Sequence, residues 1–173
     1  LGNTFMEIGQ VKIAVKSYEK ALTLKPDYVR AHNNLGIVLT QLGQLDDAMK
    51  SYEKAIVIKP DFAEAYYNLS IHKKYTPSDP QITQMQSLFS TSDLSQSDRM
   101  HLCFALAKVN EDLEKQDEQF KFLHEGNRIR KKILNYSLEK DKKTHTTYKN
   151  LFSSPPSIIE KSLSDEPPTI RPV

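Results

Sequence analysis

The side chains that most often carry catalysis or bind metals are few in this sequence and widely spaced. No two of the five histidines have the three- or four-residue spacing of a zinc site on a helix. They are His32, His72, His101, His124 and His145. The single cysteine, Cys103, excludes an internal disulfide and a cysteine-built zinc site. It lies in an apolar stretch, where we expect a buried and unreactive thiol.

Acidic residues occur as neighbouring pairs, which could in principle serve acid-base chemistry. The pairs are Asp46-Asp47, Glu111-Asp112 and Asp117-Glu118. Neighbours on a helix point in different directions, so we expect these pairs to lie on solvated faces. With only five glycines, the chain also has no Gly-rich phosphate loop and no Gly-x-Ser-x-Gly elbow. The sequence therefore predicts no catalytic site, no metal and no cofactor, and the chain itself is expected not to be an enzyme.

Composition indicates the class of protein. The 173 residues include 24 basic and 22 acidic side chains, a net charge of +2, and 38% are hydrophobic. This apolar content excludes full disorder, and the balanced charge argues against a dedicated nucleic-acid binder. No apolar run approaches the ~20 residues that cross a bilayer. A protein with no membrane partner is expected, and the single cysteine favours a reducing compartment, the cytoplasm.

The first part of the sequence contains an internal repeat, and the helices of this repeat would position any binding residues. Seven residues of the first segment, Leu1, Gly2, Gly9, Ala14, Tyr18, Ala21 and Pro26, recur at Leu35, Gly36, Gly43, Ala48, Tyr52, Ala55 and Pro60. The offset is 34 residues throughout, and it continues from Asn34 to Asn68. Such a period is typical of a solenoid of helix pairs.

This pattern resembles the tetratricopeptide repeat. The resemblance implies an all-α fold, a right-handed α-solenoid of antiparallel helix pairs, with helices over about 11–24, 29–42, 45–58 and 62–75. Small residues would allow close helix contacts, Gly9 and Gly43 would end the first helix of each pair, and Pro26 and Pro60 the second. Leu1 corresponds to the middle of a repeat, so we expect the chain to be a fragment with a truncated first repeat.

The repeat signature fades after Ser70, but helical patterns continue. Asp79-Pro80 predicts the start of the third repeat's second helix, Ser95 starts another helix, and a long helix spans 116–137. We expect repeats over 1–94 with a divergent third repeat, and a divergent helix pair over 95–138. A short helical segment over 139–163 and a Pro-rich linker over 164–173 would follow, leading to a missing C-terminal domain.

The segment from Phe104 to Gly126-Asn127, followed by the basic residues Arg128, Arg130, Lys131 and Lys132, is similar to one in bacterial tetratricopeptide-repeat sulfotransferases. It departs from that pattern at Ala107 and Glu114, where glycine is usual, and at Gln119, where alanine is usual. The resemblance implies an N-terminal arm that positions protein substrate for a catalytic domain in cis. The alternatives are a stand-alone adaptor and the arm of an O-linked N-acetylglucosamine-type glycosyltransferase.

The repeat register predicts a peptide-binding groove on the inner side of the solenoid. Its residues are Arg30, Asn33, Asn34, Ile37 and Gln41 from the second repeat and Glu64, Tyr67, Asn68 and Ile71 from the third. Side-chain amides can bind an extended backbone, as the glycosyltransferase resemblance implies for Asn34 and Asn68. Glu64 stands where chaperone-tail adaptors need a lysine, so we expect carboxylate-terminated ligands to be disfavoured. The basic run from Arg128 to Lys143 is expected to be a solvated face.

Overall fold

The computed structural model describes residues 2–135 and 138–152, and all regular secondary structure there is helical. The helices are α1 (Gly2–Leu24), α2 (Val29–Gln41), α3 (Leu45–Ile58), α4 (Ala63–Ser70), α5 (Pro80–Phe89), α6 (Gln96–Asp112), α7 (Gln116–Ile133) and α8 (Leu138–Phe152). They fall into two compact units, Leu1–Leu134 and Asn135–Val173. The all-α prediction is confirmed. The expected linker over 164–173 lies outside the described residues, and the domain boundaries stay predictions.

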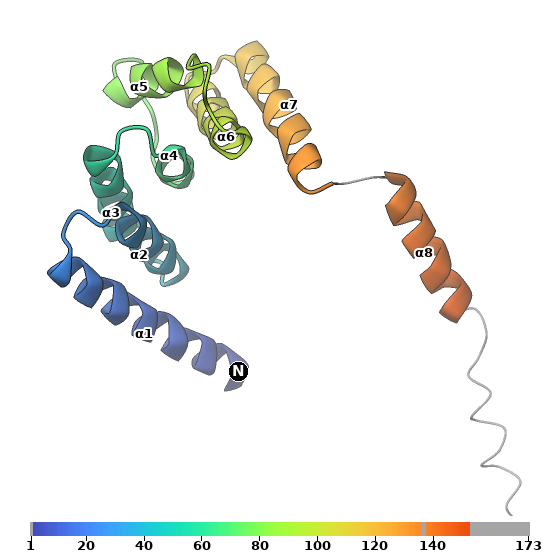
Figure 1. Cartoon of the computed structure of the whole chain (residues 1–173), viewed down its shortest axis with the longest axis horizontal. Helices are drawn as coiled ribbons and strands as arrows, with labels where there is room; N and C mark the ends of the chain where they lie inside the picture. Colours follow the sequence, from blue (N-terminus) through green and yellow to red (C-terminus); the bar gives the residue numbers. More distant parts are fainter. Residues whose placement is uncertain (1, 136–137, 153–173) are drawn as a thin grey trace, which may run out of the picture. The chain divides into compact units, whose positions relative to one another are not determined.

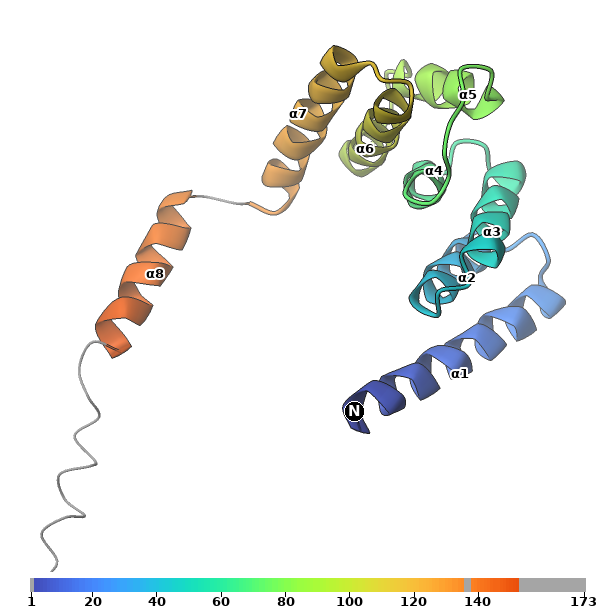
Figure 2. The ribbon, with the colours of Figure 1, turned by 180° about the vertical axis from the view of Figure 1, so that it is seen from behind.

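The first unit is an α-solenoid built from consecutive, packed helices. Helix α2 packs between α1 and α3, α3 contacts α4, and α6 packs against both α4 and α7. Helices α2, α4 and α6 lie on the inner side of the resulting arc, while α3 and α5 lie on its outer side (Figures 1 and 2). Side chains that point inward from α2, α4 and α6 therefore share one surface.

Small residues set the helix spacing, as the repeat predicted. Ala48 and Ala55 on α3 are completely buried, and Tyr52 between them is 2% exposed. Gly36 on α2 lies directly against the Tyr52 ring, because a Cβ there would stand 2.4 Å from its Cε1 atom. Gly43 adopts φ +75° and ends α2, which confirms its predicted role.

The first repeat differs from the prediction. Helix α1 runs without a break from Gly2 to Leu24, although Gly9 was expected to end one helix and residue 11 to begin the next. A single helix bonds every backbone group of this stretch, and a glycine inside a helix costs only about 1 kcal/mol relative to alanine.

The third repeat also departs from the prediction. Helix α4 ends at Ser70, whose Oγ donates to the Tyr67 carbonyl at 2.7 Å, rather than at residue 75. Helix α5 begins as expected, with Asp79 as the N-cap accepting from the Gln81 N–H. It packs mainly against α6, and its Gln84 Oε1 accepts from the Tyr66 hydroxyl of α4 at 3.2 Å. The assignment of α5 as the second helix of this repeat stays a prediction. The eight-residue α4 is too short to form a full pair, and α6 packs directly against it.

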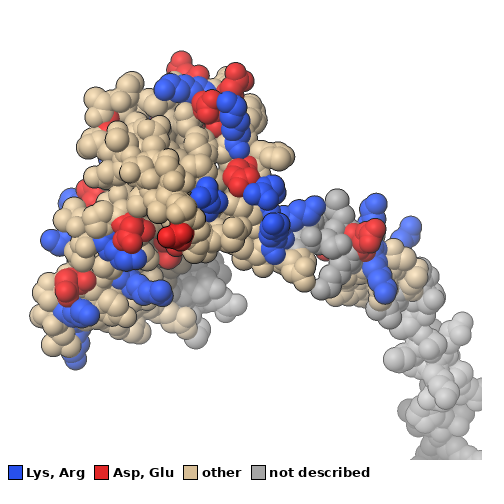
Figure 3. All heavy atoms as spheres, turned by 45° about the horizontal axis from the view of Figure 1, so that its top comes forward, with Lys and Arg blue, Asp and Glu red and all other residues tan. Residues whose placement is uncertain are grey.

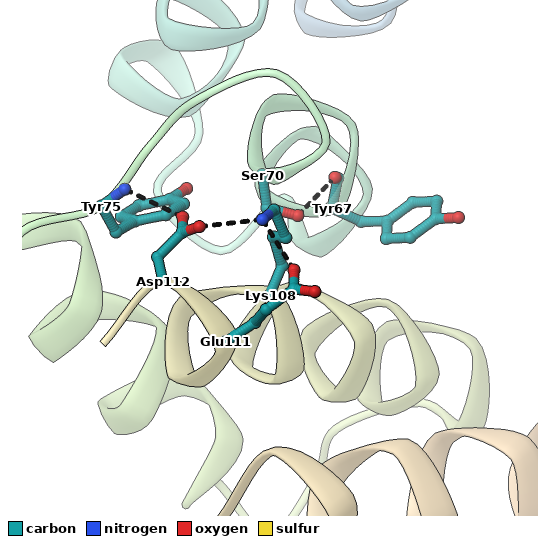
Figure 4. Close-up of polar contacts among 6 residues, drawn as sticks. All are labelled: Tyr67, Ser70, Tyr75, Lys108, Glu111 and Asp112. Carbon is teal, nitrogen blue, oxygen red and sulfur yellow. Dashed lines mark hydrogen bonds and ion pairs between the residues drawn. The ribbon is translucent and has the colours of Figure 1, made fainter. Parts of the chain in front are cut away.

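The loop between α4 and α5 is fixed to the end of α6. Its Tyr75 is 2% exposed, and the Tyr75 backbone N–H donates to Asp112 Oδ2 at 3.0 Å (Figure 4). Lys108 Nζ pairs with Asp112 at 2.8 Å and with Glu111 at 2.7 Å. Lys73 and Asp79 add a partly buried ion pair at 2.7 Å. The divergent region is thus held by specific polar contacts.

Asp112 gives the fold a pH dependence. Partial burial raises the pKa of this carboxyl, but hydrogen bonds from Lys108 and the Tyr75 N–H outweigh it and lower the pKa below its usual range. The stability from these bonds is present above the unfolded pKa, near pH 4, and is lost as pH falls through the folded pKa. We expect Asp112→Asn to lower the free energy of unfolding by about 1 kcal/mol or more at pH 7, and less at pH 3. Urea unfolding at both pH values tests this, and equal losses would contradict it.

The turn between α6 and α7 is strained at Glu114. This residue adopts φ +58°, in the left-handed region that favours glycine. We expect Glu114→Gly to raise the free energy of unfolding by about 1 kcal/mol. The matched change Gly43→Ala, at φ +75° in the turn after α2, should lower it by a similar amount. Urea denaturation of both variants measures the effect, and a destabilised Glu114→Gly would refute the assignment.

Candidate inner-face site

Polar side chains of α2 and α4 form a directed chain of hydrogen bonds. Asn68 Nδ2 donates to Asn33 Oδ1 at 2.9 Å, and Asn33 Nδ2 donates to Glu64 Oε1 at 3.1 Å. Asn33 is only 1% exposed, so it bridges the two helices and cannot touch a ligand, which corrects its predicted place in the groove. The last acceptor in this series of hydrogen bonds is Glu64. Its carboxylate is therefore oriented by a neutral amide, which does not cancel its charge.

An aromatic group extends this arrangement to α6. The Tyr67 ring stacks on His101 with 5.6 Å between ring centroids and an interplanar angle of 23°, and lies 6.0 Å from the Phe104 ring. Burial lowers the pKa of His101, outweighing the opposite effects of Glu64 and Asp98, so its ring is neutral at pH 7. We call Asn33, Glu64, Tyr67, Asn68, His101 and Phe104 the inner-face cluster.

The remaining predicted groove residues lie on the same helices but outside this cluster. Arg30, Gln41 and Ile71 are exposed, whereas Asn34 and Ile37 are partly buried. Ile37 packs against the main core, which gives it a structural role. The structure therefore joins four of the nine predicted residues, and Arg30, Asn34 and Gln41 are left as further polar groups of α2.

His101 and Phe104 were missed as site residues. The sequence did contain a signal for His101, because the 34-residue step that leads from Asn33 to Tyr67 leads next to His101. The repeat signature had faded by that point, so the register was not extended onto α6. Helix α6 takes the place that the inner helix of a further repeat would have, since it packs against α4.

Outside the inner-face cluster, the residues that could carry chemistry are buried or paired with neighbouring residues. Cys103 is fully buried, and burial raises the pKa of its thiol to about 11, in keeping with the predicted unreactive thiol. No group of three or more His, Cys, Asp or Glu in residues 2–135 and 138–152 could hold a metal ion. Arg128 in the basic run pairs with Glu125 on the same helix at 2.7 Å.

Among the described helices, none is long and apolar enough to cross a membrane.

Comparisons with known proteins support the repeat fold. The sequence profile of the family described as TPR repeat matches residues 2–43 and 36–70. A crystal structure of MamA is similar with a TM-score of 0.51 and 23% identity, covering 79% of this chain and 78% of MamA. A double mutant of MamA RS-1 gives a TM-score of 0.47 and 22% identity over 76% of this chain and 72% of its own. No curated protein matches the sequence significantly.

Proposed function

We propose, from the premise that residues 2–70 are tetratricopeptide repeats, that this chain is a non-catalytic scaffold that binds an extended segment of another protein. The ligand would lie along the inner side of α2, α4 and α6. The observation that carries this proposal is the inner-face cluster, which gathers amides, a carboxylate and aromatic rings from two repeats and α6 on one surface.

The available hydrogen-bonding groups suit a peptide backbone. Asn68 uses one N–H towards Asn33, which leaves its second N–H and its carbonyl oxygen for a ligand. Asn34, the equivalent residue one repeat earlier, is partly buried on α2. Side-chain amides of this kind offer both a donor and an acceptor, so each can satisfy one peptide group of an extended strand.

Replacing both amides should weaken binding. We expect Asn34→Ala with Asn68→Ala to reduce peptide affinity by about 1 kcal/mol for each lost hydrogen bond. Because Asn68 also bonds Asn33, the Asn34→Ala single variant separates ligand contact from stability. The measurement is fluorescence titration of peptides selected on an array, with thermal unfolding of each variant in parallel.

The matched control is Lys131→Ala with Lys132→Ala, since both lysines are exposed on α7, away from the predicted groove. This pair should leave affinity unchanged. If the lysine changes weaken binding and the asparagine changes do not, then the basic helix is the binding surface and the inner-face assignment fails.

We also propose that the chain is the arm of a cytoplasmic sulfotransferase. The support is the Phe104 to Asn127 pattern, within which Gly126 is buried and a Cβ there would lie 3.1 Å from Cys103 Cβ. The isolated chain should then show no affinity for phosphoadenosine phosphosulfate in calorimetry, and the full-length gene product should transfer sulfate from it. A full-length product without a donor site would favour the stand-alone adaptor instead.

A further inference from the structure

The carboxylate of Glu64 is oriented by the protein but not paired with a cation. Asn33 donates to one of its oxygens, and no lysine or arginine in the described residues forms an ion pair with it. A hydrogen bond from a neutral amide holds the carboxylate without cancelling its charge. The inner-face cluster therefore presents an anionic acceptor in a fixed position.

The lysine and the arginine of α6 are engaged elsewhere, whereas Arg30 of α2 is not. Lys108 of α6 pairs with Asp112 and Glu111. The Arg99 guanidinium lies over the Phe89 ring, 4.8 Å from its centroid. Arg30 is exposed and makes no ion pair within the part of the chain described. The additional charge near His101 is that of Asp98, which is also negative.

Aromatic rings of α4 and α6 share the inner side of the solenoid with the Glu64 carboxylate. Glu64 and Tyr67 are three residues apart on α4 and so lie on one face of that helix. Figure 4 shows the Tyr67 side chain pointing away from Ser70, Tyr75 and the Lys108 ion pairs. Its ring stacks on the neutral His101, and Phe104 lies alongside. A carboxylate next to such rings matches an alkyl-stemmed cation, which can pack its stem and ion-pair its head.

We propose that the inner-face cluster selects a basic residue, arginine or lysine, in an extended peptide ligand. This inference rests on the proposed peptide-binding function and names the chemistry of its ligand. The cation would pair with the Glu64 carboxylate while its stem packs against Tyr67. An acidic residue at the same place is disfavoured, because like charges a few ångströms apart near a protein surface repel.

The test compares peptides that differ in one charge. The probes are acetylated and amidated nonapeptides with randomised flanks and a fixed central arginine, citrulline, lysine, norleucine or glutamate, titrated by fluorescence polarisation against the full 173-residue chain. We expect the arginine peptides to bind about tenfold more tightly than the citrulline peptides, and the lysine peptides more tightly than the norleucine peptides. Citrulline keeps the shape of arginine without its charge, so the comparison isolates the ion pair.

Two variants of the protein test whether the preference for arginine peptides comes from Glu64. Glu64→Gln keeps an acceptor for Asn33 but removes the charge, and it should abolish the arginine preference while leaving thermal unfolding unchanged. The control Glu53→Gln alters an exposed carboxylate on the outer helix α3 and should preserve the preference. Equal affinities for arginine and citrulline peptides, with binding still weakened by the asparagine variants, would overturn the basic-residue inference alone. Binding of none of the probes would overturn the peptide-binding function as well.

Discussion

Replacing Gly36 with alanine is expected to lower the free energy of unfolding by about 1 to 3 kcal/mol, because the added methyl group has no space. Its Cβ would lie 2.4 Å from Cε1 and 2.7 Å from Cδ1 of Tyr52. The ring cannot move aside easily, since Tyr52 is 2% exposed between the buried Ala48 and Ala55 and its hydroxyl bonds with Thr40 Oγ1 at 3.2 Å. Equilibrium unfolding in urea, followed by circular dichroism, measures the loss.

Gly9 provides the matched control for this substitution. It also lies inside a helix, but a Cβ at Gly9 would meet nothing within 4 Å. Gly9→Ala should therefore raise the free energy of unfolding by up to about 1 kcal/mol through helix propensity alone. Opposite signs at the two glycines would locate the effect in the α2–α3 contact. A Gly36→Ala variant as stable as the parent protein would refute the predicted packing.

The parts of the fold that could be predicted are those governed by the 34-residue repeat. Helices α2 and α3, the contact of Gly36 with Tyr52 and the left-handed Gly43 all follow from residues that recur with that spacing. A repeat constrains a fold strongly, because each residue type must suit the same contact more than once. The sequence was most informative where two copies of the repeat could be compared.

The structure departs from the prediction in two places, the first repeat and the region where the repeat signature fades. The short α4 and the position of α5 depend on Tyr75 and Asp112, two residues 37 positions apart whose contact no local pattern indicates. The unbroken α1 has a local cause, since a Cβ at Gly9 would meet nothing within 4 Å and continued backbone bonding outweighs the small cost of a glycine inside a helix. A tertiary contact therefore decided the structure around α4 and α5, whereas local helix bonding decided that of α1.

The candidate site was only partly predictable for a similar reason. The register placed Glu64, Tyr67 and Asn68 on the inner side, but it could not show that Asn33 is buried beneath them. It also gave no partner for Glu64, because the bond from Asn33 joins residues 31 positions apart on different helices. A helical register determines which face a side chain occupies, whereas its partners depend on how the helices pack.

Helix α5 is the element whose contribution to stability is least evident from the sequence. Residues 80–92 contain no Lys, Arg, Asp or Glu, and the surface over this region is largely uncharged (Figure 3). The helix packs mainly against α6, and the Tyr66 hydroxyl joins it to α4 through Gln84. Its anchors include its N-cap, Asp79, the buried side chains of Ile82 and Met85, and the Phe89 ring, which lies 5.4 Å from the Phe122 ring between centroids.

Met85→Ala should lower the free energy of unfolding by about 2 to 5 kcal/mol, because the Met85 side chain is completely buried and its removal leaves a cavity in the main core. The neighbouring Gln86→Ala, at an exposed position, should change stability by less than about 0.5 kcal/mol. Urea unfolding gives both values, and hydrogen exchange shows whether α5 opens alone or with α6. Local opening of α5 without loss of global stability would show that the solenoid core ends at α4, α6 and α7. A full loss would establish α5 as part of that core.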